Sequence, residues 1–180
     1  MAPKDRTPDA RAVSVPSLCK EGATVAGTWP QHDLARLAES LFEPPSGDVA
    51  WSATGLEVPV AGGEPELWLH LQAEAMVTLQ CQRCLKAVRQ ALVVDRRFRF
   101  ARSEEEAEKL DEELEDDVLA LQPRLNLQEL AEDELILALP LVARHEGDCP
   151  EPLPLPDEDG FDEEAAPNPF AALAALKTRN

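Results

Sequence analysis

The stretch LWLHLQAEAMVTLQCQRCLKAVRQALVVDRRFRF, residues 67–100, decides the fold of this 180-residue chain. Every second residue from Leu67 to Leu79 is apolar, and Cys81 continues the alternation. A second alternating run follows the CQRC tetrapeptide, and its apolar members are Val88, Leu92, Val94, Phe98 and Phe100. Because successive side chains of a strand point to opposite faces, both runs indicate half-buried strands. We predict an antiparallel hairpin whose turn carries the cysteines.

The residues before the hairpin predict further strands and a helix. Residues 13–29 have the pattern of short strand pieces. Residues 31–42 follow Pro30 and predict an amphipathic helix that ends before a Pro-Pro pair; its apolar residues are Leu34, Leu37, Ala38 and Leu41. Residues 49–58 alternate again, and we expect a bulge at Gly55.

A second helix is predicted after the hairpin, over residues 126–139. Asn126 and Glu129 have the spacing of a capping box, and Pro140 stops the helix. Its apolar face is expected to carry Leu127, Leu130 and Ala131, and its polar face Glu129, Glu132 and Asp133. The predicted fold class is α+β: an antiparallel sheet with a long central hairpin, covered by helices near 31–42 and 126–139.

Charge is distributed very unevenly along the chain. The formal net charge is -18, yet residues 1–102 hold twelve acidic and twelve basic residues, whereas residues 103–164 hold 23 acidic and three basic ones. The acidic stretch at 103–117 is expected to be either a solvated helix or a mobile loop. This balance excludes a uniformly basic protein that coats nucleic acid, but it leaves room for a local basic contact.

Composition also predicts the domain organisation. We expect a flexible arm (1–12), a single α+β domain (13–146), an acidic, Pro-rich linker (147–168) and a C-terminal docking helix (169–178). This last helix would dock in a groove of this protein or of a partner through Asn168, Pro169, Phe170, Leu173 and Leu176. The longest apolar run, residues 135–143, is about half of the ~20 residues that a membrane-spanning helix needs. We therefore expect a cytoplasmic protein without membrane contact, and the oligomeric state is left open.

The cysteines indicate thiols or a metal site rather than a disulfide framework. Cys81 and Cys84 offer two thiolates from one turn, and His145 and Cys149 could complete a tetrahedral zinc site. The alternative is a tight hairpin with small apolar side chains, a solvent-exposed Cys149 and an ordinary surface His145. A thiol-redox role is a further alternative, although such enzymes place the motif at a helix N-terminus rather than between strands. Cys19 has no partner by spacing and is expected to be structural.

A local basic stretch is the candidate RNA contact. It contains Arg83, Lys86, Arg89, Arg97 and Arg99. On the second hairpin strand, Arg89, Arg97 and Arg99 face away from the apolar residues and could meet phosphates. Alternatively, these arginines pair with the acids of 103–117 or simply solvate an outer sheet face. The acidic segment itself is expected either to compete with RNA for these arginines or to contact a basic protein.

Nothing in the sequence recommends a catalytic site, and we expect no enzyme activity. Carboxylate runs such as residues 104–106 are typical of solvated faces, whereas acid-base catalysis needs carboxylates held in a pocket. His32, His70 and His145 are dispersed along the chain.

Several of these segments together resemble the YceD family of large ribosomal RNA subunit accumulation proteins. The matching pieces, in order, are CQRC (81–84), EDELILALP (132–140), His145, Cys149 and the terminal NPFA (168–171) with Leu173, Leu176 and Lys177. The resemblance implies a ribosome-biogenesis factor needed for synthesis, processing or stability of large-subunit (23S) ribosomal RNA. Its partners would be that RNA, ribosomal proteins or assembly intermediates, and it would act by binding. The alternative function is a zinc-binding or thiol-redox accessory protein.

Overall fold

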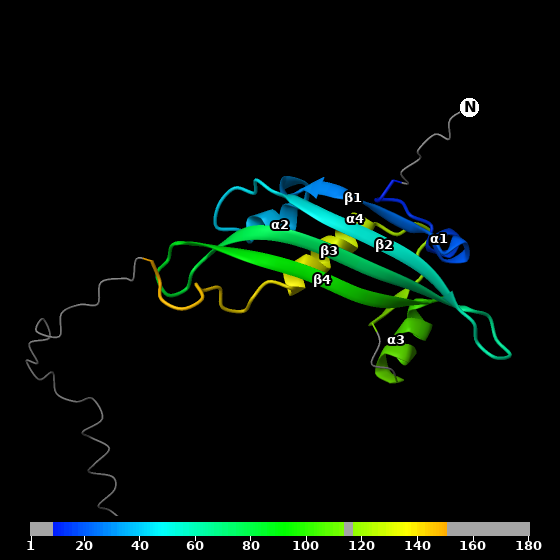
Figure 1. Cartoon of the computed structure of the whole chain (residues 1–180). Helices are drawn as coiled ribbons and strands as arrows, with labels where there is room; N and C mark the ends of the chain where they lie inside the picture. The colour runs from blue at the N-terminus through cyan, green and yellow to red at the C-terminus, as the bar shows by residue number, and fades with distance from the viewer. Residues whose placement is uncertain (1–8, 114–116, 151–180) are drawn as a thin grey trace, which may run out of the picture.

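A computed structural model describes residues 9–113 and 117–150 (Figure 1). Five strands form one sheet in the order β1-β2-β3-β4-β5, antiparallel except for the last pair. The strands are β1 (Thr24–Pro30), β2 (Asp48–Val58), β3 (Glu66–Gln80), β4 (Ala87–Ala101) and β5 (Asp117–Ala120). The helices are α1 (Val15–Glu21), α2 (Ala35–Glu39), α3 (Glu104–Glu113) and α4 (Leu127–Leu137), with a short 3-10 turn, η1 (Gln31–Asp33). The predicted α+β class is confirmed.

The central hairpin is formed by β3 and β4, as predicted. The two strands pair from Leu67 opposite Phe100 to Gln80 opposite Ala87 without interruption. Cross-strand pairs such as Leu69 and Phe98 are buried on one face, while the intervening residues are largely exposed on the other. The alternation of apolar and polar residues in the sequence therefore corresponds to a sheet with one covered face.

The helices α2 and α4 lie on that covered face, and Figure 1 shows α4 behind β3 and β4. Their apolar residues complete the core, in which Leu34, Leu37, Leu127 and Leu135 are fully buried. The opposite face of the sheet carries exposed side chains, among them Val93, which is 63% exposed. The sheet thus offers one open face to solvent. No helix among residues 9–113 and 117–150 has the length and apolar character needed to cross a membrane.

The prediction of strand pieces at 13–29 was wrong for its first half. Residues Val15–Glu21 form α1, which places Val15, Leu18 and Cys19 on one buried side and ends at Gly22 in the left-handed conformation. Only Val13 makes an isolated bridge, with Leu125, before this helix. The helical spacing i, i+3, i+4 was present but spans two turns only, too short to be distinguished from a strand by pattern.

The helix predicted at 31–42 is shorter and interrupted. Leu34 adopts φ -100° and ψ 82°, which separates η1 from α2, and α2 ends at Glu39. Leu34 and Leu37 are nevertheless both fully buried, as the spacing required.

Gly55 does not form the expected bulge. It pairs in regular register with Leu69. Glycine is needed at this position because of what packs against the face of the sheet. A Cβ at this position would lie 2.5 Å from the carbonyl carbon of Leu18 and 2.6 Å from the nitrogen of Cys19. The absence of a side chain therefore lets the backbone of α1 pack directly on β2.

The acidic stretch begins as a helix, α3, which was one of the two alternatives for it. Sequence reasoning missed β5, which runs parallel to β4 opposite residues 98–101. The capping prediction for α4 is confirmed, since Asn126 Oδ1 accepts from the Glu129 N–H at 3.2 Å. The placement of Glu132 on a polar face was wrong, because Glu132 is buried against α2.

Candidate functional site

The turn between β3 and β4 places Cys81 and Cys84 side by side. The Cys81 N–H donates to Lys86 O and the Leu85 N–H donates to Cys81 O, both at 2.8 Å. Leu85 takes a positive φ of 60°, which closes this tight turn. Both cysteine side chains are fully buried. The CQRC motif therefore lies in a hairpin turn between strands, as predicted, and no helix N-terminus in the described part of the chain adjoins it.

A later segment, residues 143–149, packs against this turn. The Gln82 N–H donates to Ala143 O at 2.8 Å, which holds the two backbones together. Cys149 Sγ lies 3.8 Å from Cys81 Sγ, and His145 Nδ1 lies 3.6 Å from Cys84 Sγ. The four ligand atoms all lie within 4.8 Å of one another. The structure thus brings together all four residues of the predicted metal set, and Cys149 is buried rather than solvent-exposed.

The surroundings of this Cys/His cluster stabilise negative charge on two of its thiols and positive charge on its imidazole. Burial opposes ionisation of Cys81, but backbone hydrogen bonds from Cys84, Arg83 and His145 outweigh it and lower the pKa of Cys81 to about 5. The Arg83 guanidinium, whose Nε donates to Cys149 Sγ at 3.0 Å, lowers the pKa of Cys149. Hydrogen bonds to Cys149 and Cys81 raise the pKa of His145. Burial raises the pKa of Cys84, so the cluster favours thiolates at Cys81 and Cys149, and the thiolate is the form of cysteine that binds metals.

One ring nitrogen of His145 is held by the backbone. Its Nε2 donates to Ala87 O at 3.1 Å, which leaves Nδ1 facing the three thiols. Ala87 is the first residue of β4, so the orientation of the imidazole is set by the sheet itself.

The predicted basic residues do not form one continuous stripe. Arg83 turns toward the Cys/His cluster, where its Nη2 also donates to Gly147 O, and Arg99 pairs with Glu66 at 2.8 Å. Lys86 is exposed in the turn. Arg89 and Arg97 remain on the open face of β4, without an ion pair to any residue in the described ranges. We call these two residues the β4 arginines.

Between the β4 arginines, the open face is mixed in character. Val93 is exposed, and Asp95 bonds to His70 Nε2 at 2.7 Å. This bond, together with one from Gln72, lowers the pKa of Asp95.

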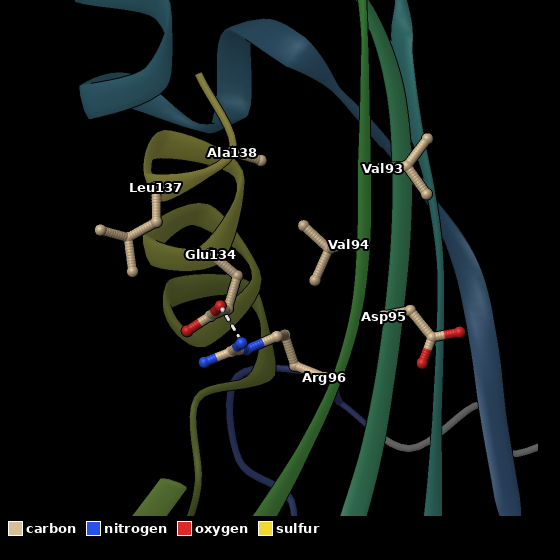
Figure 2. A pocket seen from close by; sticks show the side chains of 7 residues that line it. All are labelled: Val93, Val94, Asp95, Arg96, Glu134, Leu137 and Ala138. Atoms are coloured by element: carbon tan, nitrogen blue, oxygen red, sulfur yellow. Dashed lines mark ion pairs between the residues drawn. The ribbon is translucent and has the colours of Figure 1, made fainter. Parts of the chain in front are cut away.

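Arg96 points to the covered side of the sheet, which explains why it interrupts the apolar alternation. It pairs with Asp117 at 2.6 Å and with Glu134 at 3.5 Å. Figure 2 shows Arg96 and Glu134 pointing toward each other between β4 and α4. Both line a hollow of about 410 Å³, as does Leu137. Asp117 belongs to the acidic stretch 103–117, but Arg96 is not one of the arginines proposed for RNA contact, so the pair does not decide between the alternatives for those.

The docking residues Asn168, Pro169, Phe170, Leu173 and Leu176 lie outside the described residues, as does most of the expected linker. The predicted domain boundaries and RNA contacts stay predictions.

Comparison with known proteins identifies relatives for the larger part of the chain. The family model described as large ribosomal RNA subunit accumulation protein YceD matches residues 69–177. A relative from Haemophilus influenzae, the large ribosomal RNA subunit accumulation protein YceD, is 37% identical over 106 residues. That match covers 57% of this chain and 61% of the relative. No solved structure matches the chain. The family match begins in β3 and includes the whole Cys/His cluster, so this chain belongs to the YceD family.

Proposed function

We propose that this protein supports the accumulation of large-subunit (23S) ribosomal RNA by binding rather than by catalysis. The observation that carries the proposal is the family match over residues 69–177, whose description names large ribosomal RNA subunit accumulation. The partner proposed is the large-subunit RNA itself or an assembly intermediate that contains it. The expected cytoplasmic location follows from the same role, because ribosome assembly takes place there.

The open face of the sheet is the surface that best suits such a contact. It carries the β4 arginines, Arg89 and Arg97, and exposed apolar side chains, Met76 and Val93, on neighbouring strands. Guanidinium groups bind phosphate in a planar, two-pronged geometry, and neither β4 arginine is neutralised by an ion pair within the described chain.

The acidic residues of α3 do not prevent this contact at Arg89. Arg89 and Arg97 are separated along β4 by roughly 27 Å at about 3.4 Å per residue, whereas exposed charges are screened beyond about 8 Å at physiological ionic strength. Acidic residues on α3 therefore have little effect on the field at Arg89, which is the β4 arginine nearer the Cys/His cluster.

A depletion experiment tests the role in the cell. Depleting the protein is expected to lower large-subunit rRNA relative to small-subunit rRNA, and the full chain supplied from a plasmid should restore the ratio. An unchanged ratio after verified depletion would contradict the proposal.

Binding to RNA fragments tests the surface and the mode of action. The double variant Arg89→Glu with Arg97→Glu is expected to weaken binding to large-subunit rRNA fragments and to flatten its salt dependence. The matched control, Lys20→Glu with Lys109→Glu, changes the net charge equally at exposed sites on α1 and α3. Equal losses in both variants would argue against the open face. Specific RNA binding that survives in both would place the RNA contact on another surface. Selective capture of a basic ribosomal protein would favour a protein partner instead. Shortened RNA after incubation would contradict action by binding alone.

A further inference from the structure

We propose that Cys81, Cys84, His145 and Cys149 bind one zinc ion in a closed, four-coordinate site that fastens residues 145–149 to the β3–β4 turn. Zinc binds the soft thiolate and imidazole ligands that these residues offer, and three cysteines with one histidine are a common structural set. The proposal goes beyond the role in rRNA accumulation and does not depend on it.

Two of the distances between the ligand atoms match those of a tetrahedron around zinc. Bonds of about 2.3 Å to sulfur and 2.05 Å to nitrogen place two sulfurs about 3.8 Å apart, and a sulfur and a nitrogen about 3.6 Å apart. The corresponding distances here are 3.8 Å for Cys81 to Cys149 and 3.6 Å for Cys84 to His145. A disulfide needs sulfurs about 2.05 Å apart, so these sulfurs are too far apart for a disulfide, and their spacing fits two ligands of one zinc ion.

The environment supplies the outer contacts that a zinc site requires. Ligating histidines usually donate their second ring nitrogen to a carbonyl or carboxylate, and His145 Nε2 donates to Ala87 O. Three thiolates and one neutral imidazole leave a zinc site with one excess negative charge. The Arg83 guanidinium, which contacts Cys149 Sγ, lies where it offsets that charge.

The site has a structural rather than a catalytic arrangement. All four ligands come from the protein, and the three cysteines are buried, so no open position is left for water or substrate. Cys81 and Cys149 are 68 residues apart in sequence, and residues 139–150 contain neither helix nor strand. Zinc would thus hold in place a segment that has little secondary structure of its own.

Metal content and thiol protection test the proposal directly. The full chain, expressed in zinc-supplemented medium and purified under reducing conditions without a histidine tag, is expected to contain one zinc per chain. Zinc should protect Cys81, Cys84 and Cys149 from a thiol reagent. Cys19 is not a ligand and should react like any free thiol once the protein is denatured. Cobalt substitution should give the visible absorption of tetrahedral thiolate coordination.

Variants assign the ligands. Cys149→Ser and His145→Gln are each expected to lower zinc content well below one per chain, whereas Cys19→Ala, which removes a buried thiol at α1, should retain one zinc. If a ligand variant fails to fold, the cobalt spectrum and the thiol count of the unaltered chain still decide the question. Folded, reduced protein with well under one zinc per chain, after growth in zinc-supplemented medium, overturns the proposal. That result would leave the rRNA experiments unaffected.

Discussion

The carboxylate of Glu132 caps a helix that lies 96 residues earlier in the chain. Its Oε1 accepts hydrogen bonds from the backbone N–H of Arg36 at 2.8 Å and of Leu37 at 3.1 Å. Residue Leu34 precedes α2 and has no capping side chain, so these N–H groups have no local acceptor. The Arg36 guanidinium also contacts Glu132 Oε2, at 3.1 Å. Glu132 therefore joins α4 to α2 within the helical layer.

Replacing Glu132 by Ala is expected to destabilise the protein by about 2–4 kcal/mol, because it removes a cap and leaves buried N–H groups unpaired. Urea unfolding of the full chain measures this. The control is Asp133→Ala, which removes the other carboxylate that contacts Arg36, at 2.5 Å. Asp133 is 46% exposed, so its loss should cost less than about 1 kcal/mol. Similar losses of stability in the two variants would show that the capping bonds of Glu132 contribute no more than an exposed ion pair.

Glu132 also shows what the sequence could and could not predict. The period of two fixed β3, β4 and their register, because both strands bury one face along almost their whole length. In α4, by contrast, the buried side includes Gln128 and Glu132, whose partners Asp33 and Arg36 lie more than 90 residues away. A polar residue buried by a distant partner looks like a surface residue in a local pattern.

Short elements were missed for a related reason. The strand β5 has four residues and pairs only with the end of β4, so no alternation long enough to recognise exists. The four members of the Cys/His cluster, however, were all predicted. Few residue types bind metals, so cysteines and histidines can be named as candidate ligands even where the fold between them is unknown.

Gly55→Ala is expected to lower the free energy of unfolding by about 1–3 kcal/mol or more. The added Cβ would meet backbone atoms of Leu18 and Cys19 rather than a flexible side chain, so α1 would have to move off β2. Gly63→Ala is the control: the nearest atom to its Cβ would be Val60 Cγ1 at 3.5 Å, an ordinary contact. Thermal unfolding of both variants should separate them clearly. A Gly55→Ala protein as stable as the control would mean that α1 is not packed on β2 as described.

The pKa of Glu134 predicts how one substitution changes stability with pH. Burial raises this pKa, and Arg96 only partly offsets the effect. The folded state therefore binds more protons than the unfolded state as pH rises from the ordinary carboxyl pKa of about 4.3 to the raised value, and stability is lost across that window. Glu134→Gln cannot ionise and should be more stable than the unaltered protein at neutral pH, but not at more acidic pH. Arg96 keeps Asp117 as a partner at 2.6 Å.

Denaturant unfolding at acidic and neutral pH measures this difference for Glu134→Gln. Glu39→Gln, which removes one carboxylate at an exposed site on α2, is the control for the change of charge and should not show this pH-dependent gain. A Glu134→Gln protein that is less stable at neutral pH would show that the ion pair with Arg96 outweighs burial.

Arg83 should tune the proposed zinc site without being one of its ligands. Its Nε donates to Cys149 Sγ at 3.0 Å, so it both orients that thiolate and offsets the excess negative charge of the site. Loss of an outer contact of this kind typically weakens metal binding about 10–100-fold. Arg83→Gln is accordingly expected to bind one zinc at saturation but to release it to a chromophoric chelator at lower chelator concentration. Arg144→Gln removes an exposed arginine close in sequence to His145 and should leave the affinity unchanged. An equal loss in both variants would assign the effect to general charge, and the bond between Arg83 and Cys149 would then have no distinct role.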